Sequence, residues 1–194
     1  MRTFKQYIGI NEWKASSKNT VSIANYDSFL YKVNLKDRIR VFNDQWKELK
    51  DHRNDVFING KRVEVNEYGW TTEYYEVGVY EVLINISKVT DCENMFKSCH
   101  HLYIVPYLNT INVKNMSFMF SFCTELVKVE GMETKNVVSM ERMFRSCHHL
   151  ETVPLFNVDN CKYLDNMFYD CPSLSFKSKK EWMKIYDFDE HIKK

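Results

Sequence analysis

The sequence predicts an α+β fold in which a solenoid of four 24-residue repeats carries an N-terminal α+β cap and a C-terminal capping helix. Three observations lead to this fold class: a repeated phrase in residues 89–174, a hairpin signal in residues 1–88 and a helix-start signal in residues 175–194. We take these three ranges as the domains of the chain. Repetition at a fixed short period is typical of units that bury their apolar side only by stacking on neighbours.

The repeated phrase is Met-Phe-x-x-Cys-x-x-Leu, and its copies follow one another at intervals of 24 residues without insertion or deletion. In the third copy Val137, Met140 and Met143 recur at a spacing that suits one face of a short helix. Residues 150–154 then resemble a short strand that ends at a proline. Each unit is therefore predicted to be a helical piece, a tight turn and a strand stacked in parallel on the next copy. The four copies of the phrase begin at Met95, Met119, Met143 and Met167.

Residues 1–88 are predicted to alternate between helix and strand. Apolar residues at helical spacing indicate a short helix over residues 1–15 and a longer one over residues 35–51. Residues 28–33 lie between them and read as a strand.

A β-hairpin is predicted next, because Asn59-Gly60 lies between β-rich flanks in residues 56–65. Residues 74–87 are rich in Tyr and Val and continue as β structure. We expect the last of these strands, near residues 82–86, to pair with the first strand of the repeats. The cap and the repeats would then form one continuous body.

A helix is predicted after the last repeat. Pro172 ends the fourth copy, and Ser178 and Glu181 have the spacing of a capping box that opens a helix. Trp182 would lie on its buried side. The open end of a stack exposes apolar surface and a strand edge, so we expect this helix to act as a lid.

Composition and charge bear on the class of partner. The net charge is +1, so the chain lacks the basic excess that binding to phosphate backbones requires. No apolar run has the length of a membrane span, and no hydrophobic stretch follows Met1. We therefore expect a cytoplasmic protein without a signal peptide, with no nucleic-acid or membrane partner and with reduced thiols.

The repeat unit resembles the BspA-like leucine-rich repeat, in the Met-Phe variant common in bacterial surface proteins and in phage or mobile-element proteins. Residues 110–117, Thr-Ile-Asn-Val-Lys-Asn-Met-Ser, are similar to a characteristic stretch of that variant. The resemblance covers residues 89–174. It implies a curved leucine-rich-repeat solenoid that binds other proteins without catalysis. Surface adhesins of the family carry export signals, which are not recognisable here; a phage-related protein would act in the host cytoplasm or the virion.

A ladder of Cys residues, each one repeat after the last, raises the question of a metal or redox site. A zinc site needs four N or S ligands that converge on one point, whereas a ladder places the thiols along a line. We therefore expect small buried residues, no cofactor and no metal. The sequence does not show a Ser or Cys nucleophile positioned against the neighbouring His residues, so no catalytic residue is assigned. The residues concerned are Cys99, Cys123, Cys147 and Cys171, with His100, His101, His148 and His149.

The positions that vary between copies are the candidates for partner binding, because they lie on or beside the exposed strand of a leucine-rich repeat. An apolar patch with a polar rim there would be typical of an interface. A merely solvated face is the alternative. The predicted binding residues, which we call the strand face, are Tyr103, Ile104, Pro106, Tyr107, Lys128, Glu130, Glu151 and Thr152.

Together these patterns predict a non-enzymatic protein–protein interaction module, acting as an inhibitor, adaptor or structural component. Two other functions are left open: a Cys/His metal-binding or redox-sensing protein, and a surface adhesin whose leader has been removed. The sequence does not identify the partner or the oligomeric state.

Overall fold

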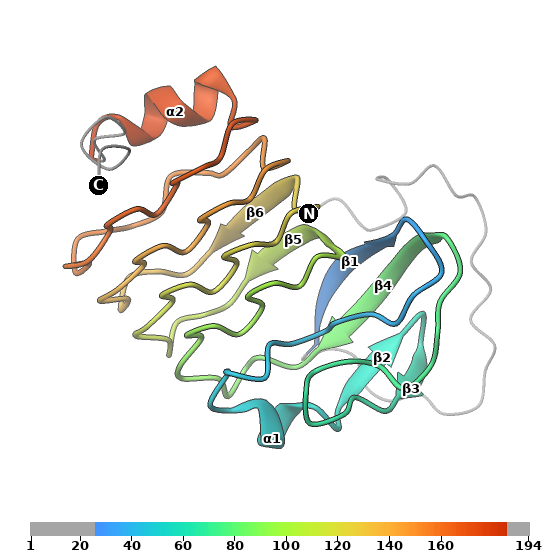
Figure 1. The fold of residues 1–194 in the computed structure, drawn as a ribbon. Coiled ribbons are helices and arrows are strands. Elements are labelled where there is room, and N and C mark those ends of the chain that lie inside the picture. The colour runs from blue at the N-terminus through green and yellow to red at the C-terminus, as the bar shows by residue number, and fades with distance from the viewer. Residues whose placement is uncertain (1–25, 186–194) are drawn as a thin grey trace.

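The computed structural model describes residues 26–185. Its helices and strands are β1 (Asp27–Val33), α1 (Leu49–His52), β2 (Val56–Ile58), β3 (Lys61–Val63), β4 (Gly78–Ile84), β5 (Leu102–Leu108), β6 (Lys128–Met132) and α2 (Phe176–Trp182). The strands form one six-stranded mixed sheet in the order β3-β2-β4-β1-β5-β6. β5 and β6 are parallel, and the other neighbours are antiparallel. Figure 1 shows the repeated segments side by side between β1 and α2.

The predicted fold class is wrong. The structure is a single mixed sheet shared by the N-terminal strands and the first two repeats, and not a cap attached to a solenoid of four helix-and-strand units. Only the first and second copies contain a strand, and at the equivalent position the third has only the bridge from Lys128 to Thr152. In the fourth copy α2 occupies the equivalent place in the sequence. The expected strand repetition therefore stops after two units.

The predicted hairpin is confirmed. β2 and β3 pair through Ile58 and Lys61, and Asn59 and Gly60 form the turn with φ angles of 47° and 78°. Positive φ at both positions is what the tight two-residue hairpin turn requires, and Asn and Gly adopt it at little cost. The predicted strand at residues 28–33 is confirmed as β1.

The connection between the two halves of the sheet differs from the prediction. β4 pairs with β1 and β2, so it is not the neighbour of the first repeat strand. β1 takes that place and pairs with β5, with Leu30 opposite Ile104 and Tyr31 opposite Leu102. The antiparallel β1–β4 pair was not predicted, because sequence patterns give strand positions but not strand order.

The predicted helix over residues 35–51 is wrong, since only residues 49–52 are helical. The preceding segment instead caps the first repeat. The backbone N–H of Asn43 donates to the carbonyl of Met95 at 2.9 Å, and its side-chain Nδ2 donates to Lys97 O at 2.8 Å. Trp46 Nε1 donates to Asp91 O at 2.7 Å. These bonds satisfy carbonyls on the outer edge of the stack, which a helix could not reach.

The predicted helical piece of each repeat is a pair of turns. In the first copy Asn94 and Ser98 have φ angles of 62° and 58°, which interrupt any right-handed helix. Alternate N–H groups donate to the next copy: Asn94 N to Ser117 O at 3.1 Å and Phe96 N to Met119 O at 2.9 Å. A spacing of three residues fits an inward face in helices and in successive turns alike, which explains the misassignment.

The repeated apolar residues form the core between the copies. The rings of Phe96, Phe120, Phe144 and Phe168 stack as a column with centroid distances of 5.6, 5.5 and 5.6 Å. At one end of the column the ring of Phe29 in β1 lies 5.1 Å from that of Phe96, centroid to centroid. At the other end the ring of Trp182 in α2 lies edge-on to Phe168, with the centroids 5.2 Å apart. The column therefore joins the N-terminal strands, the repeats and the last helix into one core.

The C-terminal helix begins three residues earlier than predicted, after Ser175, whose side chain accepts a hydrogen bond from Ser178 N. Ser178 is buried and its Oγ lies 3.4 Å from Val153 N, so it ties the helix to the third copy. The predicted helix over residues 1–15 and the end of the chain, residues 186–194, lie outside the described residues.

Candidate interaction surface

The strand residues of the repeats divide into an inward and an outward set. Val105, Val129 and Val153 are at equivalent places in three copies and are buried. Because side chains alternate along a strand, the residues on either side of each valine point outward. Lys128 and Glu130 are such a pair, and their side chains form an ion pair at 3.0 Å.

The structure brings five residues of the strand face together on this outward side: Ile104, Pro106, Lys128, Glu130 and Thr152. Ile104 lies opposite Lys128 in the parallel β5–β6 pair, and Lys128 bridges to Thr152. The outward positions therefore form two adjacent rows across the copies.

The other three predicted residues lie at the margins. Tyr103 is half-buried, with the Lys32 Nζ 5.4 Å from the centre of its ring. Glu151 precedes the bridge at Thr152 and is exposed. Tyr107 is 49% exposed near the end of β5. They extend the surface along the chain direction but do not join the two central rows.

Tyr107 also explains a glycine in the second copy. A Cβ atom added to Gly131 would lie 2.9 Å from Cδ2 of the Tyr107 ring, closer than such atoms approach in proteins. Gly131 thus allows the ring to cover the backbone of β6. Leu155 occupies the equivalent position of the third copy and is 45% exposed. The margin of the strand face is therefore apolar beside the Lys128–Glu130 ion pair.

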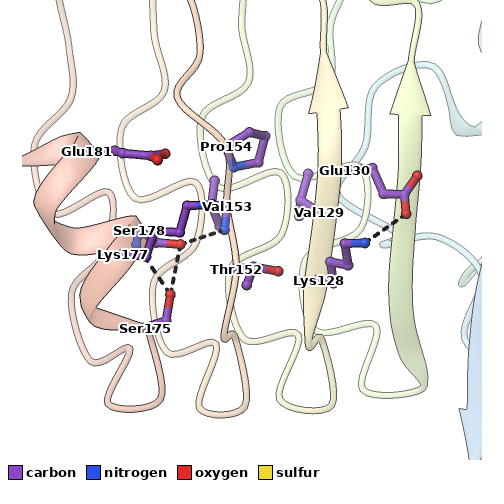
Figure 2. A pocket seen from close by; sticks show the side chains of 10 residues that line it. All are labelled: Lys128, Val129, Glu130, Thr152, Val153, Pro154, Ser175, Lys177, Ser178 and Glu181. Carbon is purple, nitrogen blue, oxygen red and sulfur yellow. Dashed lines mark hydrogen bonds and ion pairs between the residues drawn. The ribbon is translucent and has the colours of Figure 1, made fainter.

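A pocket of about 420 Å³ opens where β6, the third copy and α2 meet. Figure 2 shows Lys128 and Glu130 on its strand side and Glu181 projecting from α2 toward Pro154. Seven of the pocket's ten lining residues are polar or charged. The lining consists of Lys128, Val129, Glu130, Thr152, Val153, Pro154, Ser175, Lys177, Ser178 and Glu181.

Four of the lining residues were missed by sequence reasoning: Ser175, Lys177, Ser178 and Glu181. They belong to the C-terminal helix and its cap, which the sequence presents as a lid for the end of the stack. The signal that could have found them is the 24-residue period. If the period is continued past the third copy, residues 175–178 take the position of residues 151–154, which include the outward residues Thr152 and Pro154.

The cysteine ladder is part of the core. Cys123, Cys147 and Cys171 are buried, and the Sγ of each donates to the backbone carbonyl of a Phe in the preceding copy. For Cys147 the acceptor is Phe120 O at 3.0 Å. Burial raises the pKa of Cys147 well above its ordinary value and that of Cys171 to about 12, because a thiolate would lose its hydration.

The paired histidines make separate contacts. His148 Nε2 lies 2.9 Å from Asp170 Oδ2, whereas His149 Nδ1 lies 2.6 Å from Thr124 O. Burial lowers the pKa of His100 and of His101, which favours neutral rings. Within residues 26–185 no group of three or more His, Cys, Asp or Glu side chains is arranged to hold a metal ion.

Thiol burial leads to a prediction for chemical labelling. Cys161 is the half-exposed member of the six cysteines, and the other five are buried. We expect iodoacetamide to modify Cys161 in the native protein and the other cysteines only in urea, as measured by mass spectrometry. The Cys161→Ser variant should take up no iodoacetamide while it is in the native state. Labelling of Cys147 as fast as Cys161 without denaturant would contradict the burial of the ladder.

The comparisons with known proteins place the repeats in a family. A family model described as "Mycoplasma protein of unknown function, DUF285" matches residues 82–182, which is just over half of the 194-residue chain. The chain belongs to the DUF285 family. The matched span of this DUF285 protein includes the whole repeat block and α2. Comparisons with curated proteins and with solved structures gave no match.

Within residues 26–185 of the DUF285 protein, no helix has the length and apolar character needed to cross a bilayer.

Proposed function

We propose that this DUF285 protein is a non-enzymatic module that binds another protein through the strand face. The observation that carries the proposal is the contrast between the two sides of the repeats. The inward positions of Met95, Phe96, Cys99 and Leu102 keep the same residue in all four copies. The outward position of Ile104, by contrast, is Lys128 in the second copy and Thr152 in the third. A regular core thus holds a varied surface in fixed geometry, which reduces the entropy lost on binding.

The chemistry of the surface supports the same function. Tyr107 and Leu155 expose apolar area at the margin, and the Lys128–Glu130 ion pair lines the strand side of the pocket. Apolar anchors next to a polar rim are typical of protein interfaces, where Tyr is enriched. The resemblance to BspA-like repeats of surface and phage proteins, which bind other proteins, also supports this function.

The proposal can be tested by purifying the partner from the native host with the immobilised full chain and measuring its affinity for a strand-face variant. The triple variant Y103A/K128A/E130A should weaken binding by at least about tenfold while the protein stays folded at the assay temperature, which circular dichroism checks. None of the three side chains is in the core, so their truncation should cost less stability than that of a buried residue.

A matched control removes the same residue types elsewhere. Lys50, Glu67 and Tyr68 are exposed on the N-terminal half of the described chain, so K50A/E67A/Y68A should keep the wild-type affinity. If the strand-face variant and the control bind the partner equally well, the strand face is not the binding site.

A further inference from the structure

The outward face of α2 combines exposed apolar side chains with positively charged ones. Ser178 and Trp182 are buried on the inner side of the helix. Phe176 and Met183, on the opposite side, are 80% and 66% exposed. Seven residues are close to two helical turns, so these two side chains lie above one another with Lys180 between them. We call Phe176, Lys177, Lys180, Met183 and Lys184 the α2 face.

Positive charge is concentrated on this helix. Residues 176–185 contain four Lys and one Glu, in a chain whose total net charge is only +1. Among residues 26–185, the acidic residues beside α2 include Glu181 on the helix itself, Glu130 across the pocket and Glu151, whose backbone carbonyl accepts a hydrogen bond from Ser175 N. Glu130 is already ion-paired with Lys128. Within the described residues, the four lysines of this segment therefore outnumber these three acids.

The α2 face is continuous with the strand face. Lys177 and Glu181 line the pocket together with Lys128, Glu130 and Thr152. Figure 2 shows the helix and the third copy forming adjacent walls of this pocket. A partner segment that lies on the strand face would therefore reach α2 by crossing the pocket.

We propose that the α2 face binds an acidic segment of the protein partner, in which carboxylates flank an apolar side chain. The apolar side chain packs between Phe176 and Met183, and the carboxylates accept hydrogen bonds from Lys177, Lys180 and Lys184. This inference rests on the proposed function and specifies the chemistry of the partner. An anionic membrane is less well matched, since one short helix with two apolar anchors buries too little area for stable attachment.

The experiment uses the full chain and a synthetic peptide in which Leu residues are flanked by Glu, with Gln replacing Glu in the control peptide. Affinity is measured by fluorescence anisotropy. We expect the Glu peptide to bind about tenfold more tightly than the Gln peptide and to lose affinity as salt is added, because exposed charges are screened. The variant K177E/K180E/K184E should lose this preference, and F176A/M183A should weaken binding of both peptides.

The control K50E/K88E/K114E makes the same charge change at exposed lysines away from α2 and should behave as wild type. Equal binding of the two peptides, or unchanged binding by K177E/K180E/K184E, would overturn the inference. So would binding of phosphatidylserine vesicles in the absence of peptide binding. If the partner no longer binds Y103A/K128A/E130A but still binds K177E/K180E/K184E, the α2 face is not a binding site and the proposed function of the strand face stands.

Discussion

Phe144→Ala should lower the free energy of unfolding by about 3–5 kcal/mol, as truncation of a fully buried aromatic ring generally does. Phe144 is 0% exposed, and its ring stacks on Phe120 at 5.5 Å and on Phe168 at 5.6 Å. The ring of Phe156 also packs near it, with the two ring centroids 6.3 Å apart. The hydrogen-bonded ladders on either side fix the spacing of the copies, so the cavity cannot close by local collapse.

Urea denaturation followed by tryptophan fluorescence measures this loss. Phe176→Ala is the matched control, because its ring is 80% exposed and its removal should change stability by less than about 0.5 kcal/mol. A loss below about 1 kcal/mol for Phe144→Ala would mean that the column contributes little to stability.

The repeat period alone was enough to predict that the apolar residues of the repeated phrase are buried. Met95, Phe96 and Cys99 recur in each copy, and the structure places all of their equivalents in the core. A residue that recurs on every copy meets its own equivalents when the copies stack, and only a self-compatible apolar contact tolerates this.

The backbone of the copies could not be predicted in the same way. Helices and successive turns both direct every third residue inward, and the difference depends on φ at residues such as Phe118 and Phe122. Bulky aromatic residues rarely have positive φ, so their presence there gives no sequence signal. The hydrogen bonds to the next copy stabilise the turns in spite of this local preference.

The cap of the first copy was missed for a related reason. Apolar residues including Ile39, Phe42 and Trp46 have helical spacing, but Trp46 and Asn43 donate to carbonyls about 50 residues away in the sequence. Long-range bonds of this kind leave no local pattern. For the pocket, the 24-residue period gives the position of residues 175–178 in the stack but not their conformation. The helix that they begin depends on how the chain packs at the end of the stack.

Gly69→Ala should destabilise the protein by at least about 3 kcal/mol, because the new Cβ has no room and the backbone is in a conformation unfavourable to alanine. Gly69 has a φ of +80°, and a Cβ atom there would lie 2.1 Å from Phe42 O and 2.7 Å from Phe42 C. These are backbone atoms, so no side-chain rotation relieves the contact. Gly69 O also accepts the N–H of Val41 at 2.8 Å, which holds the two segments together.

The displaced segment is the one that caps the first repeat. Moving Phe42 away from Gly69 shifts Asn43, whose N–H and side chain satisfy the carbonyls of Met95 and Lys97. The loss of folding free energy should therefore include the cost of polar groups left buried without partners, about 1–3 kcal/mol for each group. Gly78→Ala is the matched control, since its Cβ would meet Tyr80 at an ordinary 3.5 Å. Equal melting temperatures for the two variants would show that the segment around Phe42 does not anchor the repeats.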